Sequence, residues 1–291
     1  MESILVTGAN GQLGVALRNV TDKTAGFRFY FTDVDTLDIC DRRQIGDFIR
    51  LYNIGTLVNC AAYTAVDKAE EDVDTCRRIN CDAVRNIGEL AASSGVKVIH
   101  ISTDYVFDGR ETRPYRETDA TMPMSVYGAT KLAGEQALLS SCNDTIVIRT
   151  SWLYSETGTN FVKTMLRLGT ERDELNVVAD QLGTPTYAGD LADVIKTILT
   201  SARFTPGIYH YANEGACTWF EFAVKIFELT GIQCRVNPIR TNEYPARAPR
   251  PPYSVLDKTK IKATFAIQIP TWEASLAKCL QVGADLCVCP N

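Results

Sequence analysis

The stretch ILVTGANGQLG, residues 4–14, places three glycines directly after a short apolar run. The run SILVTG has the composition of a buried β-strand, and QLGVALRNV after it has the apolar spacing of a helix. Strand-to-helix turns use glycine for steric reasons alone, so the spacing by itself is weak. A turn of this kind also lets backbone N–H groups approach a pyrophosphate at the positive end of a helix. We therefore expect Gly8, Gly11 and Gly14 to form a nucleotide-binding loop.

The rest of the first half alternates strand-like apolar runs with helical patterns. Strands are expected near residues 27–33, 56–62, 96–102 and 145–151, and helices near residues 42–52 (capped by Asp41), 73–94 and from Ser125 onward. Continuous Val/Ile runs are typical of a parallel sheet covered on both faces. We expect an α/β fold: a Rossmann-type doubly wound parallel sheet that binds NAD(P) in residues 1–152. Residues 153–291 are expected to form mostly a smaller mixed α/β substrate-binding lobe, with some segments returning to the sheet.

The composition matches a globular protein that binds small molecules. Of 291 residues, 45% are hydrophobic and 22% are charged, with a net charge of −5. Nucleic acid or an acidic membrane would favour a basic patch that the sequence does not display, and no apolar run is long enough to span a bilayer. With no export signal at the start, we expect a cytoplasmic protein with reduced, mostly buried cysteines. The pair Cys287 and Cys289 lacks the spacing that zinc sites favour.

Asp33 bears on the choice of cofactor. It closes the second expected strand about twenty residues after the glycine loop, where a carboxylate can bind the adenosine ribose. A carboxylate there favours NAD and repels the extra phosphate of NADP, and no arginine immediately follows it. The sequence therefore predicts a nicotinamide cofactor and leaves NADH and NADPH both open.

The segment SVYGATKLAGEQAL, residues 125–138, opens with Tyr127 and Lys131 four residues apart. On a helix they share one face, where an ammonium group would lower the pKa of the phenol from about 10. The strand before this helix ends in Ser102 and Thr103, whose hydroxyls could bond the substrate oxygen that the tyrosine protonates. A Tyr–Lys pair alone would more often be a surface pair, but its order after the glycine loop and the strand end favours a proton-transfer site.

Seven blocks extend this pattern along nearly the whole chain: TGANGQLG, NCAAYTAVDKAE, STDYVFDG, YGATKLAGE, RTSWLY, DQLGTPTYAGDLA and RPPYSVLD. In these blocks the chain resembles the extended short-chain dehydrogenase/reductases, and within them the dTDP-4-dehydrorhamnose reductases. The resemblance implies reduction of the 4-keto group of dTDP-6-deoxy-L-lyxo-4-hexulose, a dTDP-linked 4-keto-6-deoxy sugar, to dTDP-L-rhamnose.

The resemblance also implies roles for individual residues. Thr103, Tyr127 and Lys131 would form the catalytic set, with Lys131 also bonding the nicotinamide ribose. The cofactor would be surrounded by Gly8, Gly11, Gln12, Leu13, Gly14, Asp33, Asp38, Ile39, Ala62, Tyr63, Thr64, Tyr127 and Lys131. The sugar nucleotide would meet Thr103, Asp104, Trp152, Arg250 and Ser254. Arg250 stands among prolines, where it could instead brace its own loop.

Departures from related enzymes sharpen this expectation. Sugar-nucleotide 4,6-dehydratases carry Asp then Glu after the threonine, whereas Tyr105 follows Asp104 here, which favours simple carbonyl reduction. Some reductases of this kind are bridged into dimers by magnesium through an acidic residue in the first helix. Val15 and Ala16 occupy that turn, so we expect no such metal, and a homodimer stays open. His100 and His210 have no metal-ligand partner at useful spacing, which predicts structural roles.

Two alternatives stay open at this stage. The β subunit of methionine adenosyltransferase resembles the same family, so the fold could serve as a non-catalytic, NADP-binding regulatory subunit. A reductase of another nucleotide-linked keto-sugar would keep the mechanism and change only the product.

Overall fold

A six-stranded parallel sheet organises the structure, a computed structural model that describes residues 1–22 and 24–287, with the side chains of residues 284–287 excepted. The strands are β1 (Glu2–Thr7), β2 (Phe27–Thr32), β3 (Ile54–Asn59), β4 (Lys97–Thr103), β5 (Thr145–Thr150) and β10 (Gly207–His210). Their order across the sheet is β10-β5-β4-β3-β1-β2, and every neighbouring pair is parallel. The chain runs from β1 to β2 on one side and then crosses to β3, β4 and β5 on the other side of β1. Such sheets bind ligands in the crevice at this switch point, at the carboxyl ends of the strands, here β1, β3 and β4.

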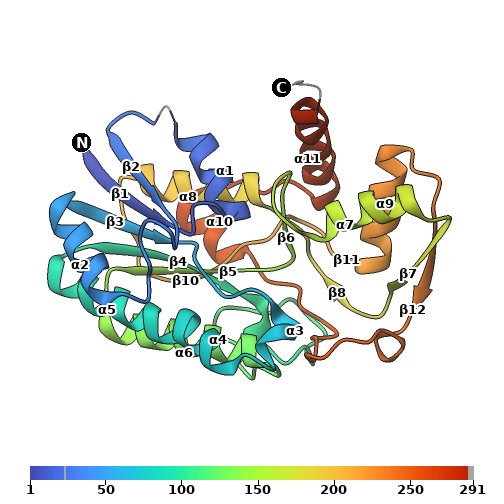
Figure 1. The fold of residues 1–291 in the computed structure, drawn as a ribbon, viewed down its shortest axis with the longest axis horizontal. Coiled ribbons are helices and arrows are strands. Elements are labelled where there is room, and N and C mark those ends of the chain that lie inside the picture. Colours follow the sequence, from blue (N-terminus) through green and yellow to red (C-terminus); the bar gives the residue numbers. More distant parts are fainter. Residues whose placement is uncertain (23, 288–291) are drawn as a thin grey trace.

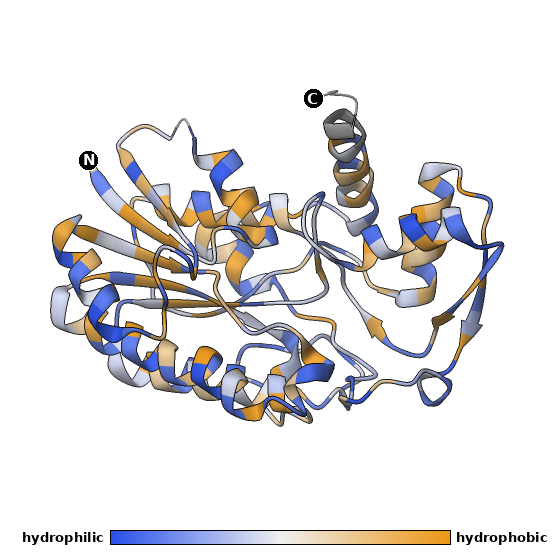
Figure 2. Ribbon diagram, in the orientation of Figure 1, coloured by the Kyte–Doolittle hydropathy of each residue, from blue (hydrophilic) through white to orange (hydrophobic). Residues whose placement is uncertain are grey.

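Helices cover both faces of this sheet, as expected for a doubly wound fold (Figure 1). One face carries α1 (Gln12–Thr21), α8 (Ala188–Thr200) and α10 (Thr259–Phe265), and the other carries α2 (Arg42–Leu51), α5 (Ala83–Ser94) and α6 (Val126–Ser141). Apolar strand residues alternate between the two layers, so that Ile4 and Val6 face α1 while Leu5 faces α5. The orange strands in Figure 2 mark this core. The predicted α/β fold is confirmed.

Two helices begin where the sequence predicts. The Asp41 carboxylate accepts hydrogen bonds from the N–H groups of Arg43 and Gln44 at 2.9 and 3.1 Å, which starts α2. The Ser125 hydroxyl accepts from Gly128 N at 3.1 Å and starts α6. Both side chains satisfy backbone donors that the first helical turn leaves without a partner.

The helical region expected over residues 73–94 contains a π-helical turn. It consists of α4 (Val73–Arg77), η1 (Arg78–Asp82) and α5, which follow one another without a break. The extra residue in the turn is typical of functional sites. A short helix, α3 (Val66–Ala69), precedes this region and was not expected.

The second half of the chain builds a smaller layer beside the carboxyl end of the sheet (Figure 1). Its helices are α7 (Phe161–Glu171), α9 (Trp219–Thr230) and α11 (Trp272–Cys287), and its strands are β6 (Leu153–Tyr154), β7 (Glu174–Val178), β8 (Leu182–Gly183), β9 (Thr186–Tyr187), β11 (Cys217–Thr218) and β12 (Arg235–Ile239). Short 3-10 turns, η2 (Asp104–Val106) and η3 (Thr241–Glu243), lie in the connections. Aromatic side chains around Phe222 fill the core of this layer. Three segments of the second half return to the large sheet: β10 is its edge strand, and α8 and α10 pack against one of its faces.

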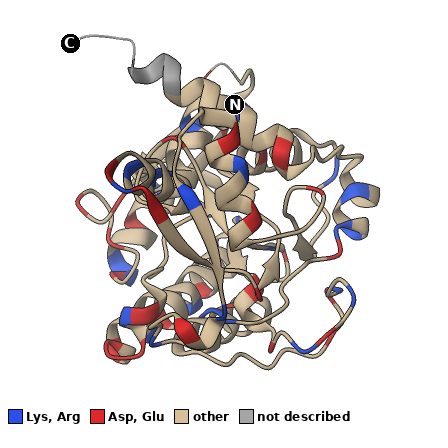
Figure 3. Cartoon of the chain, turned by 90° about the vertical axis from the view of Figure 1, so that its right-hand side faces the viewer, with Lys and Arg blue, Asp and Glu red and all other residues tan. Residues whose placement is uncertain are grey.

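Charge and sulfur are distributed as the composition suggests. Lysine and arginine are interspersed with aspartate and glutamate on the face in Figure 3. The eight cysteines whose side chains are described are free thiols, and six of them are buried. Cys289 and the side chain of Cys287 lie outside the described residues. Among the described helices, none is long and apolar enough to cross a membrane.

Candidate active site

The three glycines of the first loop have three different roles. Gly8 has a φ of +67°, and a Cβ atom on it would lie 2.6 Å from Ala61 N, so only glycine fits this turn. A Cβ on Gly14 would lie 2.4 Å from Gly8 O, so glycine lets the first turn of α1 pack closely on the loop backbone at Gly8 and Ala9. A Cβ on Gly11 would meet only Gly8 O, at 3.3 Å, which leaves the backbone there accessible. These roles fit a dinucleotide pyrophosphate at the start of α1.

Asp33 lies directly beside this loop, as the sequence predicts. Its Oδ2 atom accepts a hydrogen bond from Asn10 N at 2.8 Å, and its Oδ1 atom accepts one from Val34 N at 2.8 Å. Each carboxylate oxygen has a second lone pair, so a ribose hydroxyl could still be bound.

Other members of the expected cofactor set have their side chains turned elsewhere. The side chains of Leu13 and Ile39 are buried in the two cores of the sheet, so only their backbone atoms could meet a cofactor. The Gln12 amide oxygen accepts from Ser155 Oγ at 3.1 Å and from Asn160 Nδ2 at 2.8 Å. Gln12 therefore connects the glycine loop to the second half of the chain.

The segment after β3 is held by a residue that the sequence did not single out. The Asn80 amide accepts from Tyr63 N at 2.9 Å and donates to Tyr63 O at 3.0 Å, which fixes the backbone between Ala62 and Thr64. Asn80 lies in the π-helical turn and is almost fully buried. Asp38, by contrast, uses its Oδ1 atom to accept from Cys40 N at 2.9 Å.

Thr103 is the last residue of β4, Asp104 follows it in η2, and their side chains are in contact. The Thr103 hydroxyl donates to Asp104 Oδ1 at 2.9 Å and accepts from Tyr105 N at 3.1 Å. Asp104 is 1% exposed, and its Oδ2 atom has no hydrogen-bond partner among the described residues. Burial raises the pKa of Asp104 to about 6, although the hydroxyls of Ser254 and Thr103 oppose this shift.

Close packing places Tyr127 beside Thr103. A Cβ atom on Gly128 would lie 2.2 Å from Tyr105 O, so this glycine allows the start of α6 to lie directly on the turn after β4. The rings of Tyr127 and Tyr105 meet edge to face with centroids 5.5 Å apart. Burial raises the pKa of the Tyr127 phenol, and the Thr103 hydroxyl opposes this shift. The net shift of this pKa is therefore opposite in direction to the lowering that the sequence predicts, because desolvation dominates.

Lys131 is buried beneath the end of β4, so the surface-pair interpretation is wrong. Its side chain is 2% exposed, and its Nζ atom donates to Ile101 O at 2.6 Å. The same Nζ atom lies 3.4 Å from His100 Nε2. Burial lowers the pKa of Lys131 to about 8, whereas Glu135 favours the charged form.

The residues expected on the sugar side fall into two groups. Trp152 has a φ of +47°, and its ring stacks on Trp219 with centroids 3.5 Å apart. A Cβ on Gly183 would lie 2.6 Å from the Trp152 ring and 2.8 Å from Ser254 Oγ, so these two side chains converge next to Asp104. Arg250 instead forms a bidentate pair with Asp67 on α3, at 3.0 and 2.9 Å. This contact matches the bracing role that the sequence left open for Arg250.

Comparison with known proteins agrees with this geometry. The model of the RmlD substrate binding domain family matches residues 1–284. The dTDP-4-dehydrorhamnose reductase of Aggregatibacter actinomycetemcomitans is 40% identical over 95% of this chain and 97% of its own length. The chain belongs to the dTDP-4-dehydrorhamnose reductase family.

Further relatives support the same family. The dTDP-4-dehydrorhamnose reductase of Sinorhizobium fredii is 43% identical over 94% of each chain. A crystal structure of the dTDP-4-dehydrorhamnose reductase of Bacillus anthracis, in complex with NADP, is 41% identical with a TM-score of 0.92, and it covers 97% of this chain and 99% of that one. The predicted membership of the dTDP-4-dehydrorhamnose reductases is confirmed.

The two histidines of this family member differ in their surroundings. His210 has its Nδ1 atom 3.0 Å from Tyr115 O and its ring edge against Phe107, which agrees with the structural role predicted for it. His100 contacts Lys131, so it is more than a packing residue of the sheet. No local spacing could have revealed this contact, because it depends on how α6 lies over β4.

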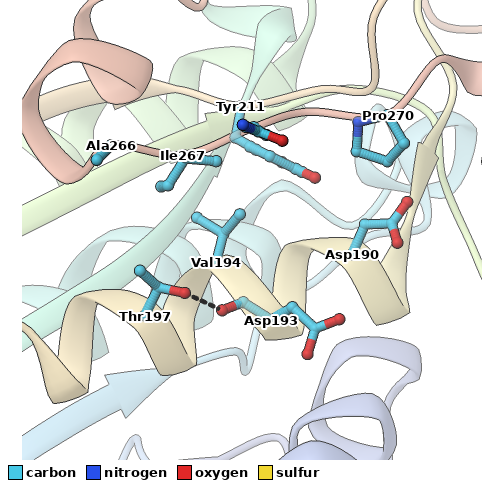
Figure 4. Close-up of a pocket in the computed structure, with 9 residues that line it drawn as sticks. Asp190, Asp193, Val194, Thr197, Tyr211, Ala266, Ile267 and Pro270 are labelled. Carbon is cyan, nitrogen blue, oxygen red and sulfur yellow. Dashed lines mark hydrogen bonds between the residues drawn. The ribbon is translucent and has the colours of Figure 1, made fainter.

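A separate groove of about 370 Å³ lies outside this site, between α8 and the segment after α10 (Figure 4). Asp190 lines it, but its carboxylate already accepts hydrogen bonds from Asn213, Ser275 and Lys278. None of the residues expected to bind cofactor or substrate lines this groove. Among the side chains of residues 1–22 and 24–283, no cluster of three or more His, Cys, Asp or Glu could hold a metal ion.

Proposed function

We propose that this chain is an NAD(P)H-dependent oxidoreductase, a dTDP-4-dehydrorhamnose reductase that converts dTDP-6-deoxy-L-lyxo-4-hexulose to dTDP-L-rhamnose. The observation that carries the proposal lies at the end of β4, where Thr103 donates to Asp104 and both lie beside Tyr127. Family membership supplies the substrate class, because the relatives are named for this reaction.

Residues 1–152 would hold the cofactor and residues 153–291 most of the sugar nucleotide. Gly11 leaves room for a pyrophosphate, and Asp33 offers its carboxylate to the adenosine ribose. The NADP in the Bacillus anthracis relative supports NADPH, while the Asp33 carboxylate favours NADH, so we propose that both are accepted. When bound, the nicotinamide would supply hydride to C4 of the keto-sugar.

Tyr127 would act as the general acid. Because burial raises its pKa, the phenol holds its proton at neutral pH and can give it to the O4 atom as negative charge develops there. The Thr103 hydroxyl, which donates to Asp104 Oδ1 in the structure, would turn to donate its hydrogen bond to the same oxygen. The Lys131 ammonium would stabilise the phenolate that remains. The unpartnered Oδ2 atom of Asp104 would accept from a sugar hydroxyl.

Trp152 and Ser254 would form the wall against the sugar. The Trp152 ring is fixed by stacking on Trp219 and by the space that Gly183 leaves, so it offers a rigid apolar face. Ser254 lies beside Asp104, where its hydroxyl could contact the same sugar. Arg250 would act through its contact with Asp67, by holding the loop that carries Ser254.

A turnover assay tests this function. Purified protein with NADPH or NADH should oxidise the cofactor when the 4-keto-sugar nucleotide is added, and should not do so with dTDP-glucose, which has no keto group. Lack of oxidation with authentic substrate, together with co-purification of a synthetase, would favour the regulatory-subunit alternative. Equal turnover of keto-sugars carried by other nucleotides would broaden the substrate.

The same proposal places the enzyme in the cytoplasm, where its free cysteines would stay reduced. A homodimer is the assembly we propose, which sedimentation of the purified protein would test.

A further inference from the structure

A row of polar side chains crosses three neighbouring strands and ends at Lys131. Thr7 on β1 lies opposite Asn59 on β3, and Asn59 lies opposite His100 on β4. Thr7 Oγ1 donates to Asn59 Oδ1 at 2.7 Å, and Asn59 Nδ2 lies 3.0 Å from His100 Nδ1. His100 Nε2 then lies 3.4 Å from Lys131 Nζ. All four side chains are at most 2% exposed, so this row is sealed from water.

The proton on His100 decides what Lys131 can carry. Burial and the nearby Lys131 hold the pKa of His100 well below its ordinary value, so the ring is neutral and has one N–H. An ammonium group at Lys131 needs Nε2 as an acceptor, which puts the proton on Nδ1. Asn59 must then present Oδ1 to His100 and Nδ2 to Thr7, an arrangement reached by turning its amide. The amide orientation in the structure suits the other tautomer, with Nε2–H facing a neutral amine.

The orientation of the Asn59 amide therefore depends on whether Lys131 is an ammonium group or a neutral amine. The other titratable groups near Lys131 are Glu135 on its own helix, Cys60 after β3 and Cys76 on α4. Glu135 favours the ammonium form. Burial raises the pKa of Cys60 to about 12 and raises that of Cys76, so both are neutral thiols at physiological pH. His100 is thus the one neutral nitrogen in this set that can accept from the ammonium group.

We propose that His100 is a positioning residue for Lys131: supported by Asn59 and Thr7, it orients the amine and holds it in its charged form. Ile101 O and His100 Nε2 together direct two of the three N–H bonds of Lys131, leaving the third for the reaction site. The inference deepens the proposed function, because it assigns the group that controls the proposed stabiliser of the Tyr127 phenolate.

Two substitutions of His100 test the contacts of its two ring nitrogens separately. In His100→Gln the amide oxygen can take the place of Nε2 towards Lys131, whereas in His100→Asn the shorter amide reaches only Asn59. We expect His100→Asn to lower the titration midpoint of Lys131 by about one pH unit. It should also lower kcat at neutral pH by about tenfold or more, chiefly because the amine loses one of the two acceptors that orient it. His100→Gln should stay within about threefold of wild type.

Asn59→Asp should shift the Lys131 midpoint in the opposite direction. A carboxylate there fixes the His100 proton on Nδ1, so Nε2 accepts from Lys131 and the midpoint should rise by about one pH unit. The added carboxylate also attracts the ammonium group directly, so a rise supports the inference together with the fall expected in His100→Asn, and the absence of a rise contradicts it by itself.

The readout does not depend on turnover. NMR of protein labelled at the lysine side-chain carbons follows the Lys131 midpoint directly, with the resonance assigned by its loss in Lys131→Met. Movement of the basic limb of the pH–rate profile by the same amount would support the inference. Identical Lys131 midpoints in wild type, His100→Asn and Asn59→Asp would overturn it. Absence of keto-sugar reduction by wild type would overturn the proposed function and leave the NMR test intact.

Discussion

Glu135 and Arg149 form a bidentate ion pair in which neither side chain reaches solvent. Arg149 Nη2 lies 2.7 Å and Nε 3.0 Å from the Glu135 carboxylate, and the side chains of Arg149 and Glu135 are 3% and 1% exposed, respectively. Ser102 also donates to Glu135. Glu135 lies one helical turn beyond Lys131, so the pair fastens α6 to β4 and β5 next to the proposed site.

Removing one partner of this pair should cost stability, because the other charge is then buried alone. We expect Glu135→Leu or Arg149→Leu to lower the free energy of unfolding by about 3–5 kcal/mol, and the double variant to lose clearly less than the sum. Urea unfolding measures this. The exposed pair Arg167 and Glu171 is the control, for which a single substitution should cost less than about 1 kcal/mol. Equal losses at the two sites would contradict the account.

Tyr127→Phe should remove the proton donor and keep the fold. We expect kcat to fall by about 10²–10⁴, with cofactor affinity within about threefold of wild type. Steady-state kinetics and a cofactor titration measure the two effects. Tyr105→Phe is the matched control, because the Tyr105 ring packs against Tyr127, and it should keep kcat within about threefold. A fully active Tyr127→Phe enzyme would exclude the assigned donor.

Two helical glycines should respond oppositely to alanine. At Gly128 the added Cβ would lie 2.2 Å from Tyr105 O, and this backbone atom cannot move aside cheaply. We expect Gly128→Ala to destabilise by about 1–3 kcal/mol and to lower kcat by shifting Tyr127. At Gly46 the nearest atom would be a side-chain carbon of Leu90 at 3.4 Å, so Gly46→Ala should stabilise by about 0.5–1 kcal/mol. Thermal or urea unfolding of both variants measures these changes in stability. A Gly128→Ala enzyme as stable and active as wild type would contradict the close contact with Tyr105 O.

Asp104 should make stability depend on pH. Its folded pKa of about 6 exceeds the ordinary 3.8, so between these values the folded protein binds the proton more tightly than the unfolded chain. The stability that protonated Asp104 contributes is fully present below pH 3.8. It is lost as the pH rises to about 6, by up to about 3 kcal/mol. Asp104→Asn should therefore gain stability relative to wild type as pH rises from about 4 to about 6. Urea unfolding of both proteins across this window measures the difference, and a constant offset would contradict the burial argument.

The sheet and its caps could be predicted because their signals are local. The apolar runs of β1 to β5 and the capping side chains of Asp41 and Ser125 are each contained within a few residues. Strand β10 has only a short run, GIYH, and its place depends on pairing with residues 146–149, far away in the chain. The π-helical turn depends on close contact with α6. A Cβ atom on Gly134 of α6 would lie only 2.0 Å from Asn80 O in this turn.

The site was predictable in its residue types and less so in its electrostatics. Helical spacing indicates that Tyr127 and Lys131 share a face, but it does not fix where a long side chain ends. In the structure the Lys131 amine meets β4, and burial rather than charge sets the pKa of Tyr127. The role of His100 required the register between β3 and β4, which no single segment encodes.

Transfer of deuterium from the cofactor to the sugar would follow the proposed hydride step itself. The purified enzyme would be given NADPH deuterated at the transferable position of its nicotinamide, together with dTDP-6-deoxy-L-lyxo-4-hexulose, and the product examined by NMR and mass spectrometry. We expect dTDP-L-rhamnose with one deuterium at C4, and far slower formation of the same labelled product by Tyr127→Phe. Unchanged keto-sugar, or a product without deuterium at C4, would contradict the proposed step.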